Sequence, residues 1–167
     1  MRIALPLLLV LACATGCEVK EKTPDYAQLA EDLTFHRQLW EDQHVASYVG
    51  RLQQTCDCPA VITQPVRMQV EGNTVVSVAN AETGAPVDSL LWIYFPPINQ
   101  LFNIIGVEIE SRVDRLDVVY HAELGYPTSI FIDPLGGTSG DEMRYAVEVE
   151  SYTITTARLL RSAPGGN

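Results

Sequence analysis

The sequence Cys56-Asp57-Cys58-Pro59 is the part of the chain whose residue types and spacing most clearly permit chemistry. Two thiols this close together can form a disulfide, take part in thiol–disulfide exchange, or bind a soft metal such as copper(I) or zinc. A zinc site needs a full tetrahedral set of ligands, and no histidine lies near this pair in the sequence. We therefore expect a disulfide between Cys56 and Cys58, and keep a redox role, a metal site and free thiols as alternatives.

The other candidate metal ligands are acidic residues at the two ends of a glycine-rich segment, namely Asp133, Asp141 and Glu142. Carboxylate oxygens bind calcium, but the spacing fits no EF-hand, and solvated acids in a turn are commoner, so we expect no metal here. A phosphate-binding loop, a dinucleotide fingerprint, a metalloprotease helix and a nucleophile elbow are all missing from the sequence. We therefore expect neither a cofactor nor enzymatic activity.

The first residues of the chain indicate export. Met1-Arg2 is basic, residues 5–12 are apolar apart from Pro6, and small residues lead to a cysteine in Ala14-Thr15-Gly16-Cys17. The apolar run is too short to span a bilayer, which takes roughly 20 residues, and the pattern is typical of a signal peptide. Its end resembles the lipobox of bacterial lipoproteins, in which the cysteine is acylated and becomes the new N-terminus.

A second candidate for the acylated cysteine is Cys13, in Val10-Leu11-Ala12-Cys13. Cleavage there would leave a very short signal peptide and an odd number of cysteines in the mature chain. We therefore expect Cys17 to carry the lipid, residues 1–16 to be removed, and residues 17–24 to form a tether. The expected location is the bacterial cell envelope, on a membrane face toward the periplasm or the exterior, with the lipid as the membrane contact.

Charge and composition restrict the classes of partner. The formal net charge is −10 and the sequence pI is ≈ 4.6, whereas nucleic-acid binding needs clustered Lys and Arg, so we exclude nucleic acid. A chain of 167 residues with 47% hydrophobic residues is long enough for one globular domain. We place this domain at residues 25–155 and expect residues 156–167 to form a partly disordered tail.

Hydrophobic periodicity predicts an α+β fold. Tyr26, Leu29, Leu33 and Trp40 recur at helical spacing, which predicts a helix over residues 25–43 with Thr23 as N-cap; a second helix begins near Ile98. Alternating apolar and polar residues predict strands around residues 46–55, 66–71, 74–78, 116–121, 130–132 and 143–150. Such alternation favours antiparallel pairing. We expect a sheet of about six strands with two helices packed on one face, in the order α-β-β-β-α-β-β-β.

Two short segments carry more specific expectations. Gly72-Asn73 stands where a two-residue hairpin turn belongs. Leu90–Phe95 is strongly apolar, and it either fills the core or offers an exposed surface to a partner. We expect the core, because large apolar residues are usually buried. His121 alternates onto the polar face of its strand, where we expect a surface residue and not a base.

A set of short motifs is distributed along the chain between residues 39 and 152. The motifs are Leu39-Trp40, Ser47-Tyr48, Cys56-Asp57-Cys58, Pro65-Val66 with Gly72, Ile98-x-x-Leu101-Phe102, Val119-Tyr120, Leu124-Gly125-Tyr126-Pro127-Thr128, Ile132-Asp133 and Asp141-Glu142. Together they resemble the bacterial family called domain of unknown function 6174, whose members are mostly predicted to be secreted or lipid-anchored. The chain departs from the pattern at Pro96-Pro97-Ile98 and in its longer tail. The resemblance implies export and the extent of the domain, but no activity.

These observations leave several functional hypotheses. The leading one is a non-catalytic binding or interaction module, held at an envelope membrane by its lipid, with an unknown envelope protein as partner. The alternative is a thiol-redox or soft-metal function of Cys56 and Cys58. A hydrolase would require His36, His44 and His121 to converge with carboxylates in one pocket.

Overall fold

Six strands form one antiparallel sheet in the order β3-β2-β1-β6-β5-β4. The computed structural model describes residues 24–136 and 140–155. Along the chain the elements are α1 (Tyr26–Asp42), β1 (Val45–Thr55), α2 (Ala60–Thr63), β2 (Val66–Glu71), β3 (Thr74–Asn80), the 3-10 helix η1 (Ser89–Tyr94), α3 (Ile98–Ser111), β4 (Arg115–Tyr120), β5 (Pro127–Asp133) and β6 (Met143–Ile154). The predicted fold class is confirmed, and α2 and η1 are additions to it. The expected signal peptide, Cys13, Cys17 and the expected tail over residues 156–167 lie outside the described residues.

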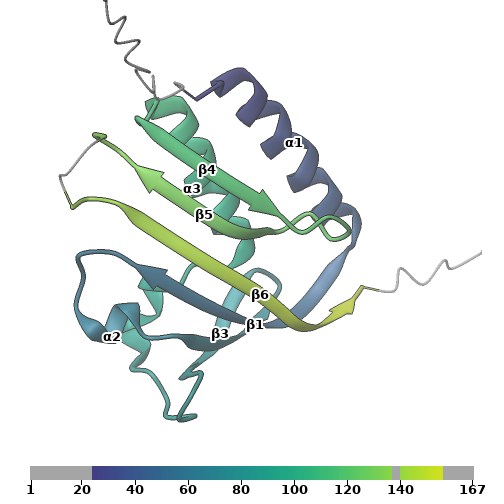
Figure 1. Cartoon of the computed structure of the whole chain (residues 1–167). Coiled ribbons are helices and arrows are strands. Elements are labelled where there is room, and N and C mark those ends of the chain that lie inside the picture. The colour runs from purple at the N-terminus through teal and green to yellow at the C-terminus, as the bar shows by residue number, and fades with distance from the viewer. Residues whose placement is uncertain (1–23, 137–139, 156–167) are drawn as a thin grey trace, which may run out of the picture.

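Pairing of β1 with β6 joins two three-stranded halves in the middle of the sheet (Figure 1). The ladder runs from Val45 opposite Ile154 to Thr55 opposite Arg144. In the first half, β2 alternates buried and exposed residues as the sequence predicts. The Gly72-Asn73 turn then joins β2 to β3, with φ of 52° and 70° at its two residues, and this conformation matches the twist of a two-residue hairpin.

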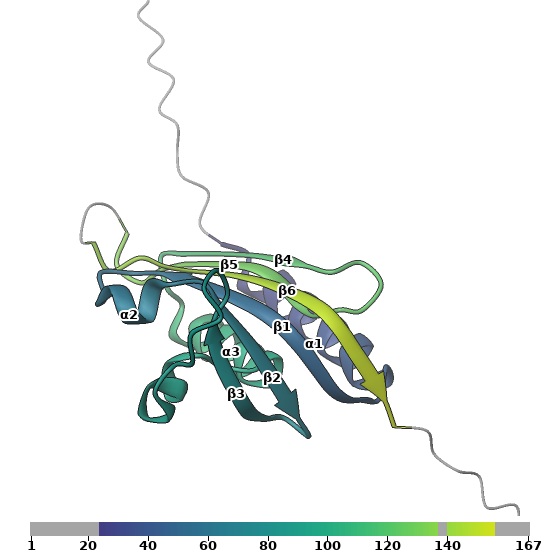
Figure 2. The ribbon, with the colours of Figure 1, turned by 90° about the horizontal axis from the view of Figure 1, so that it is seen from below.

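Helices α1 and α3 lie on the same side of the sheet, as predicted (Figure 2). Helix α3 lies against the sheet and buries Ile98, Leu101, Phe102 and Ile105, while α1 packs on α3 and buries Trp40. The other face of the sheet is open. On this open face the guanidinium groups of Arg115 and Arg144 lie 4.9 and 4.0 Å from the ring centroid of Phe131, and they leave that ring only 8% exposed.

The structure corrects two predictions about local elements. Helix α1 is capped by Asp25, whose carboxylate accepts a hydrogen bond from Gln28 N at 3.2 Å, and not by Thr23. The segment 90–95 fills the core only in part: Phe95 is buried and Leu91 and Trp92 pack against the core, whereas Leu90 is 82% exposed and Ile93 76% exposed. A 3-10 helix has three residues per turn, so Leu90 and Ile93 share one side of η1 and both face solvent.

An aromatic cluster occupies one end of the core, and most of its members belong to the family-like motifs. Its buried residues are Trp40, Tyr48, Val70, Ile98, Phe102 and Tyr126. The polar atoms of these rings are satisfied: Trp40 Nε1 donates to Asn99 Oδ1 at 3.1 Å, and the Tyr48 hydroxyl accepts from Ile98 N at 2.9 Å. These motif positions therefore encode packing, since they fix the start of α3 against α1 and β1.

Ionisation of Tyr48 is expected to destabilise the fold at alkaline pH. Burial raises the pKa of Tyr48 to about 12 from the ordinary 10.0, and the hydrogen bond from Ile98 N offsets only part of this rise. The unfolded chain ionises first, so the contribution of Tyr48 is complete below about pH 10 and is lost as the pH rises through about 12. We expect wild type to lose about 2–3 kcal/mol more than Tyr48→Phe over this range in urea unfolding. Equal losses would contradict the prediction.

Candidate functional site

Cys56 and Cys58 form a disulfide, as the sequence predicts, directly after β1 and before α2. Their Cα atoms lie 5.2 Å apart, within the range that a disulfide spans. Thr55 is the last residue of β1, and Pro59 stands just before the first residue of α2. The bridge therefore closes a tight turn between a central strand and a short helix, and it holds this turn at one end of the sheet.

A hollow with a volume of about 340 Å³ lies beside the disulfide. Its walls come from the end of β1, α2, η1, α3 and β6, and its apolar lining consists of Pro59, Ile62, Ile93, Tyr94, Pro96, Ile104, Met143 and Tyr145. Gln54, which is 4% exposed, fixes two of these walls to β1, because its Nε2 donates to Tyr94 O at 3.0 Å and to Ile62 O at 3.2 Å. We call this cavity the disulfide hollow.

A second hollow, of about 560 Å³, runs along α3 toward the β2–β3 turn. Carboxamide side chains dominate its lining, which consists of Asn73, Pro97, Asn99, Gln100, Asn103, Ile104, Val107 and Glu108. Gln100 and Ile104 line both hollows, so the two cavities adjoin. We call the combined depression the α3 groove. One end of the groove is apolar and borders the disulfide, and the other end is lined with amides.

The electrostatics of the α3 groove are one-sided. Among the residues that the structure describes, no Lys, Arg or His lines either hollow, and the charged side chains there are Asp57 and Glu108. Burial raises the pKa of Glu108. Burial also raises the pKa of Tyr145, and the carboxylate of Glu108 adds to that rise. The groove therefore presents negative potential without a cation of its own to balance it.

Exposed apolar side chains continue this surface along η1. Leu90 is 82% exposed, Ile93 76% and Tyr94 48%, and Ile93 and Tyr94 also line the disulfide hollow. Single exposed apolar residues are ordinary, but adjacent ones beside a cavity are typical of binding surfaces. The sequence predicts that this segment fills the core, and its apolar character was the only signal of the groove in the sequence.

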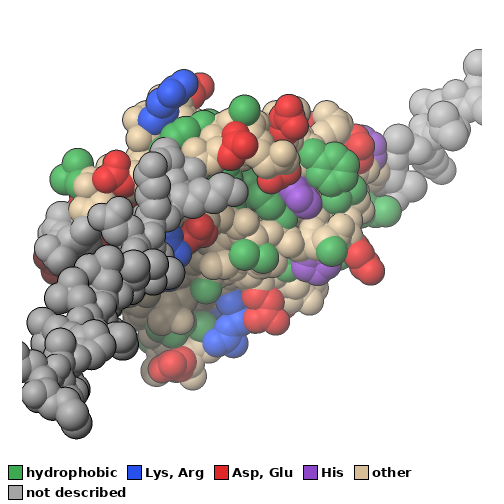
Figure 3. Space-filling view, turned by 45° about the horizontal axis from the view of Figure 1, so that its top comes forward, with side chains coloured by type: hydrophobic (Ala, Val, Ile, Leu, Met, Phe, Trp, Pro, Cys, Tyr) green, Lys and Arg blue, Asp and Glu red, His purple; other side chains and the backbone are tan. Residues whose placement is uncertain are grey.

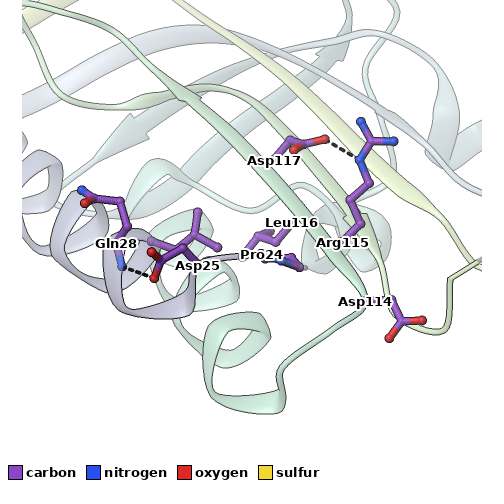
Figure 4. A pocket seen from close by; sticks show the side chains of 8 residues that line it. Pro24, Asp25, Gln28, Asp114, Arg115, Leu116 and Asp117 are labelled. Atoms are coloured by element: carbon purple, nitrogen blue, oxygen red, sulfur yellow. Dashed lines mark hydrogen bonds and ion pairs between the residues drawn. The ribbon is translucent and has the colours of Figure 1, made fainter. Parts of the chain in front are cut away.

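A third cavity, of about 360 Å³, lies between the start of α1 and the start of β4 (Figure 4). Asp25, Asp114 and Asp117 line it, and the carboxylates of Asp25 and Asp117 have structural partners. Asp25 caps α1 through Gln28 N, and Asp117 pairs with Arg115 at 2.7 Å. This cavity adjoins Pro24, the first described residue, so it lies where the expected tether joins the domain.

The acidic residues considered as weak metal candidates do not form a ligand set in the described part of the chain. Asp133 is 8% exposed, and its Oδ1 accepts a hydrogen bond from Gly136 N at 2.7 Å. Across residues 24–136 and 140–155, no group of three or more His, Cys, Asp or Glu side chains is placed to hold a metal ion, near Asp141 and Glu142 or near the disulfide.

The histidines do not converge on one site either. Figure 3 shows histidine side chains on one face of the molecule as separate patches among other side chains. His36 stacks on Tyr120 with ring centroids 4.2 Å apart, and His121 stacks on Tyr126 at 5.0 Å. His121 Nδ1 also accepts hydrogen bonds from Glu123 N and Leu124 N, so its ring holds the turn after β4. These contacts give His36 and His121 structural roles.

The fold and the site define a single-sheet α+β domain whose groove is bordered by a disulfide and carries no positive charge among its described lining residues. The chain belongs to the Family of unknown function (DUF6174), whose model matches residues 32–151. No curated protein and no solved structure matches the chain.

Among the residues that the structure describes, none of the helices combines the length and the apolar character that a membrane crossing requires.

Proposed function

We propose that this protein is a bacterial envelope lipoprotein, anchored through Cys17, whose domain is a non-catalytic binding module for another envelope protein. The proposed anchor is supported by the basic start, the short apolar run and the lipobox-like Ala14-Thr15-Gly16-Cys17. In this proposal the acyl chains hold the protein at the membrane surface, and the α3 groove contacts the partner.

The observation that carries the binding role is the exposed apolar side of η1 next to a preformed hollow. Leu90 and Ile93 together expose apolar side chains that the fold does not need, since neither packs in the core. A cavity of about 340 Å³ falls within the size range of ligand sites. The open face of the sheet is a poorer candidate, because Arg67 pairs with Glu150 there, Arg115 pairs with Asp117, and Arg115 and Arg144 cover Phe131.

Site-specific photocrosslinking in cells tests the binding role. A photoreactive amino acid replaces Ile93 in the full-length chain, and a matched variant carries it at Val119, an exposed residue of edge strand β4. We expect a discrete crosslinked species from position 93 and none from position 119. Equal crosslinking from both positions, or none from position 93 in a folded and membrane-associated protein, would show that η1 is not a binding surface.

A thiol–disulfide function is the second candidate, because the Cys56–Cys58 bridge borders the hollow and would lie beside anything bound there. We expect the bridge to be structural. Replacing both cysteines with Ser should then lower the free energy of unfolding by about 1.5 kcal/mol, as estimated for so short a loop, and leave crosslinking from position 93 intact.

Thiol titration with and without reductant checks the redox state in the same preparation. Thiols that appear only after reduction, together with unchanged crosslinking in the double variant, support a structural bridge. If the double variant keeps its stability but loses the crosslinked species, the thiol function is the better account.

A further inference from the structure

We propose that the α3 groove binds an extended peptide segment of the partner, with a large apolar side chain in the disulfide hollow and a Lys or Arg beside Glu108. This inference rests on the proposed binding function and names the chemistry of its partner. Three properties of the groove carry it, namely the shape of its apolar end, the amides of its other end, and the sign of its charge.

The apolar end fits one bulky side chain. The disulfide hollow holds about 340 Å³ and is walled by aliphatic and aromatic groups, including Ile62, Met143 and Tyr145. Gln54 uses its Nε2 to hold the walls in place, so the cavity is preformed. A large apolar side chain that fills such a cavity acts as the central anchor of an interface.

The amide end suits a peptide backbone. None of the hydrogen bonds among the described residues uses the side-chain amides of Asn73, Gln100 or Asn103, although all three line the hollow. A carboxamide both donates and accepts, and so does each peptide unit of an extended chain. Gln100 lines both hollows, so a segment anchored in one continues into the other.

Charge selects a basic segment over an acidic one. Asp57 lines the disulfide hollow and Glu108 lines the adjoining hollow, and no cation within the described lining balances them. Burial disfavours the charged form of Glu108, and this cost is relieved when a ligand brings a cation close. The net charge of −10 disfavours acidic partners further and favours encounter with basic ones.

Selection from a random-sequence peptide display library tests the proposal on the full-length protein purified in detergent. We expect enriched peptides to combine a large apolar residue with Lys or Arg a few residues away. The affinity of an enriched peptide is then measured by fluorescence anisotropy against variants. Ile93→Asp should weaken it about tenfold or more, while the control Val119→Asp, at an exposed apolar position outside the groove, should leave it unchanged.

The Glu108→Gln variant tests how the charge of Glu108 contributes to the affinity for the peptide. Glu108→Gln should weaken the same peptide several-fold and flatten the dependence of its affinity on salt, whereas replacing the basic residue of the peptide should remove the effect of Glu108→Gln. Enriched peptides without basic residues, or binding that Ile93→Asp does not weaken, would overturn the proposal. Native mass spectrometry shows whether an acyl chain co-purifies with the protein. If it does, and if Ile93→Asp abolishes this binding, the occupant of the disulfide hollow is a lipid and not a peptide.

Failure of this inference is distinguishable from failure of the proposed function. Crosslinking of a partner protein from position 93 in cells does not depend on the sequence or the charge of the segment that binds. A discrete crosslink together with a failed peptide selection would retain the binding role and reject the basic peptide. Absence of both would reject the groove as a binding surface.

Discussion

Replacing Gly125 with alanine will lower the free energy of unfolding by about 3 kcal/mol. This is a larger loss than we expect from alanine at any other described glycine. Gly125 lies between β4 and β5 with a φ of +80°, a conformation that costs an L-residue about 1–2 kcal/mol. An added Cβ would also stand 2.4 Å from His36 O and 3.0 Å from Trp40 N. Both atoms belong to the backbone of α1, so relief requires the turn and the helix to separate.

Gly84→Ala is the matched control for this prediction. Gly84 has a φ of +71°, but an added Cβ there meets nothing within 4 Å. It therefore carries the conformational cost without the clash, and we expect a loss of about 1–2 kcal/mol. Urea unfolding of both variants measures the difference. Equal losses would show that the contact of the 121–126 turn with α1 does not constrain Gly125.

Trp40→Ala should cost about 3–5 kcal/mol, the range for truncating a buried aromatic residue. Trp40 is 5% exposed and meets Tyr48 and Tyr126 edge to face, with ring centroids 5.9 and 5.8 Å away. Its Nε1 also donates to Asn99 at the start of α3. Truncation would leave a cavity at the junction of α1, α3 and β1, and remove the donor that Asn99 accepts from.

Phe35→Ala provides the control on the same helix, because Phe35 is 64% exposed. We expect its loss to stay within about 0.5 kcal/mol, as for most surface positions. Trp40→Phe keeps much of the volume and removes the hydrogen bond, so it should lie between the two. A Trp40→Ala protein as stable as wild type would contradict the structural reading of the Leu39-Trp40 motif.

The hydrophobic periodicity of the sequence was sufficient to predict the sheet and the two long helices. Val66, Met68 and Val70 alternate so regularly that the buried face of β2 follows directly. Gly72-Asn73 then predicts a two-residue hairpin turn between β2 and β3. The covering of Phe131 by Arg115 and Arg144 was not predictable, because cation–π contacts join neighbouring strands and depend on their register.

The candidate site was predictable only in part. Adjacent thiols identified the disulfide, since pairing of Cys56 with Cys58 depends on local spacing and compartment. The groove beside it brings together residues from β1, α2, η1, α3 and β6, and no local pattern encodes such an assembly. The prediction that Leu90 and Ile93 fill the core was wrong, because composition distinguishes apolar from polar segments but does not distinguish a core strand from an exposed 3-10 helix.

The family-like motifs separate into two kinds in the structure. Trp40, Tyr48, Phe102 and Tyr126 form the aromatic cluster, and Gly125 fits the close approach of a turn to α1. Cys56-Asp57-Cys58 is different, because it lies outside this cluster and borders the disulfide hollow. The first kind accounts for the fold, and the second marks the surface on which we place binding.

The mass of the mature N-terminal peptide tests the central claim, that the protein is anchored in the envelope through Cys17, most directly. The protein is extracted from membranes of a bacterial host with detergent, digested and measured by mass spectrometry. The proposal predicts a peptide that begins at Cys17 and carries the mass of acyl chains, and its loss in Cys17→Ala but not in Cys13→Ala. An unmodified peptide that spans Cys17, recovered from membrane-extracted protein, would contradict it.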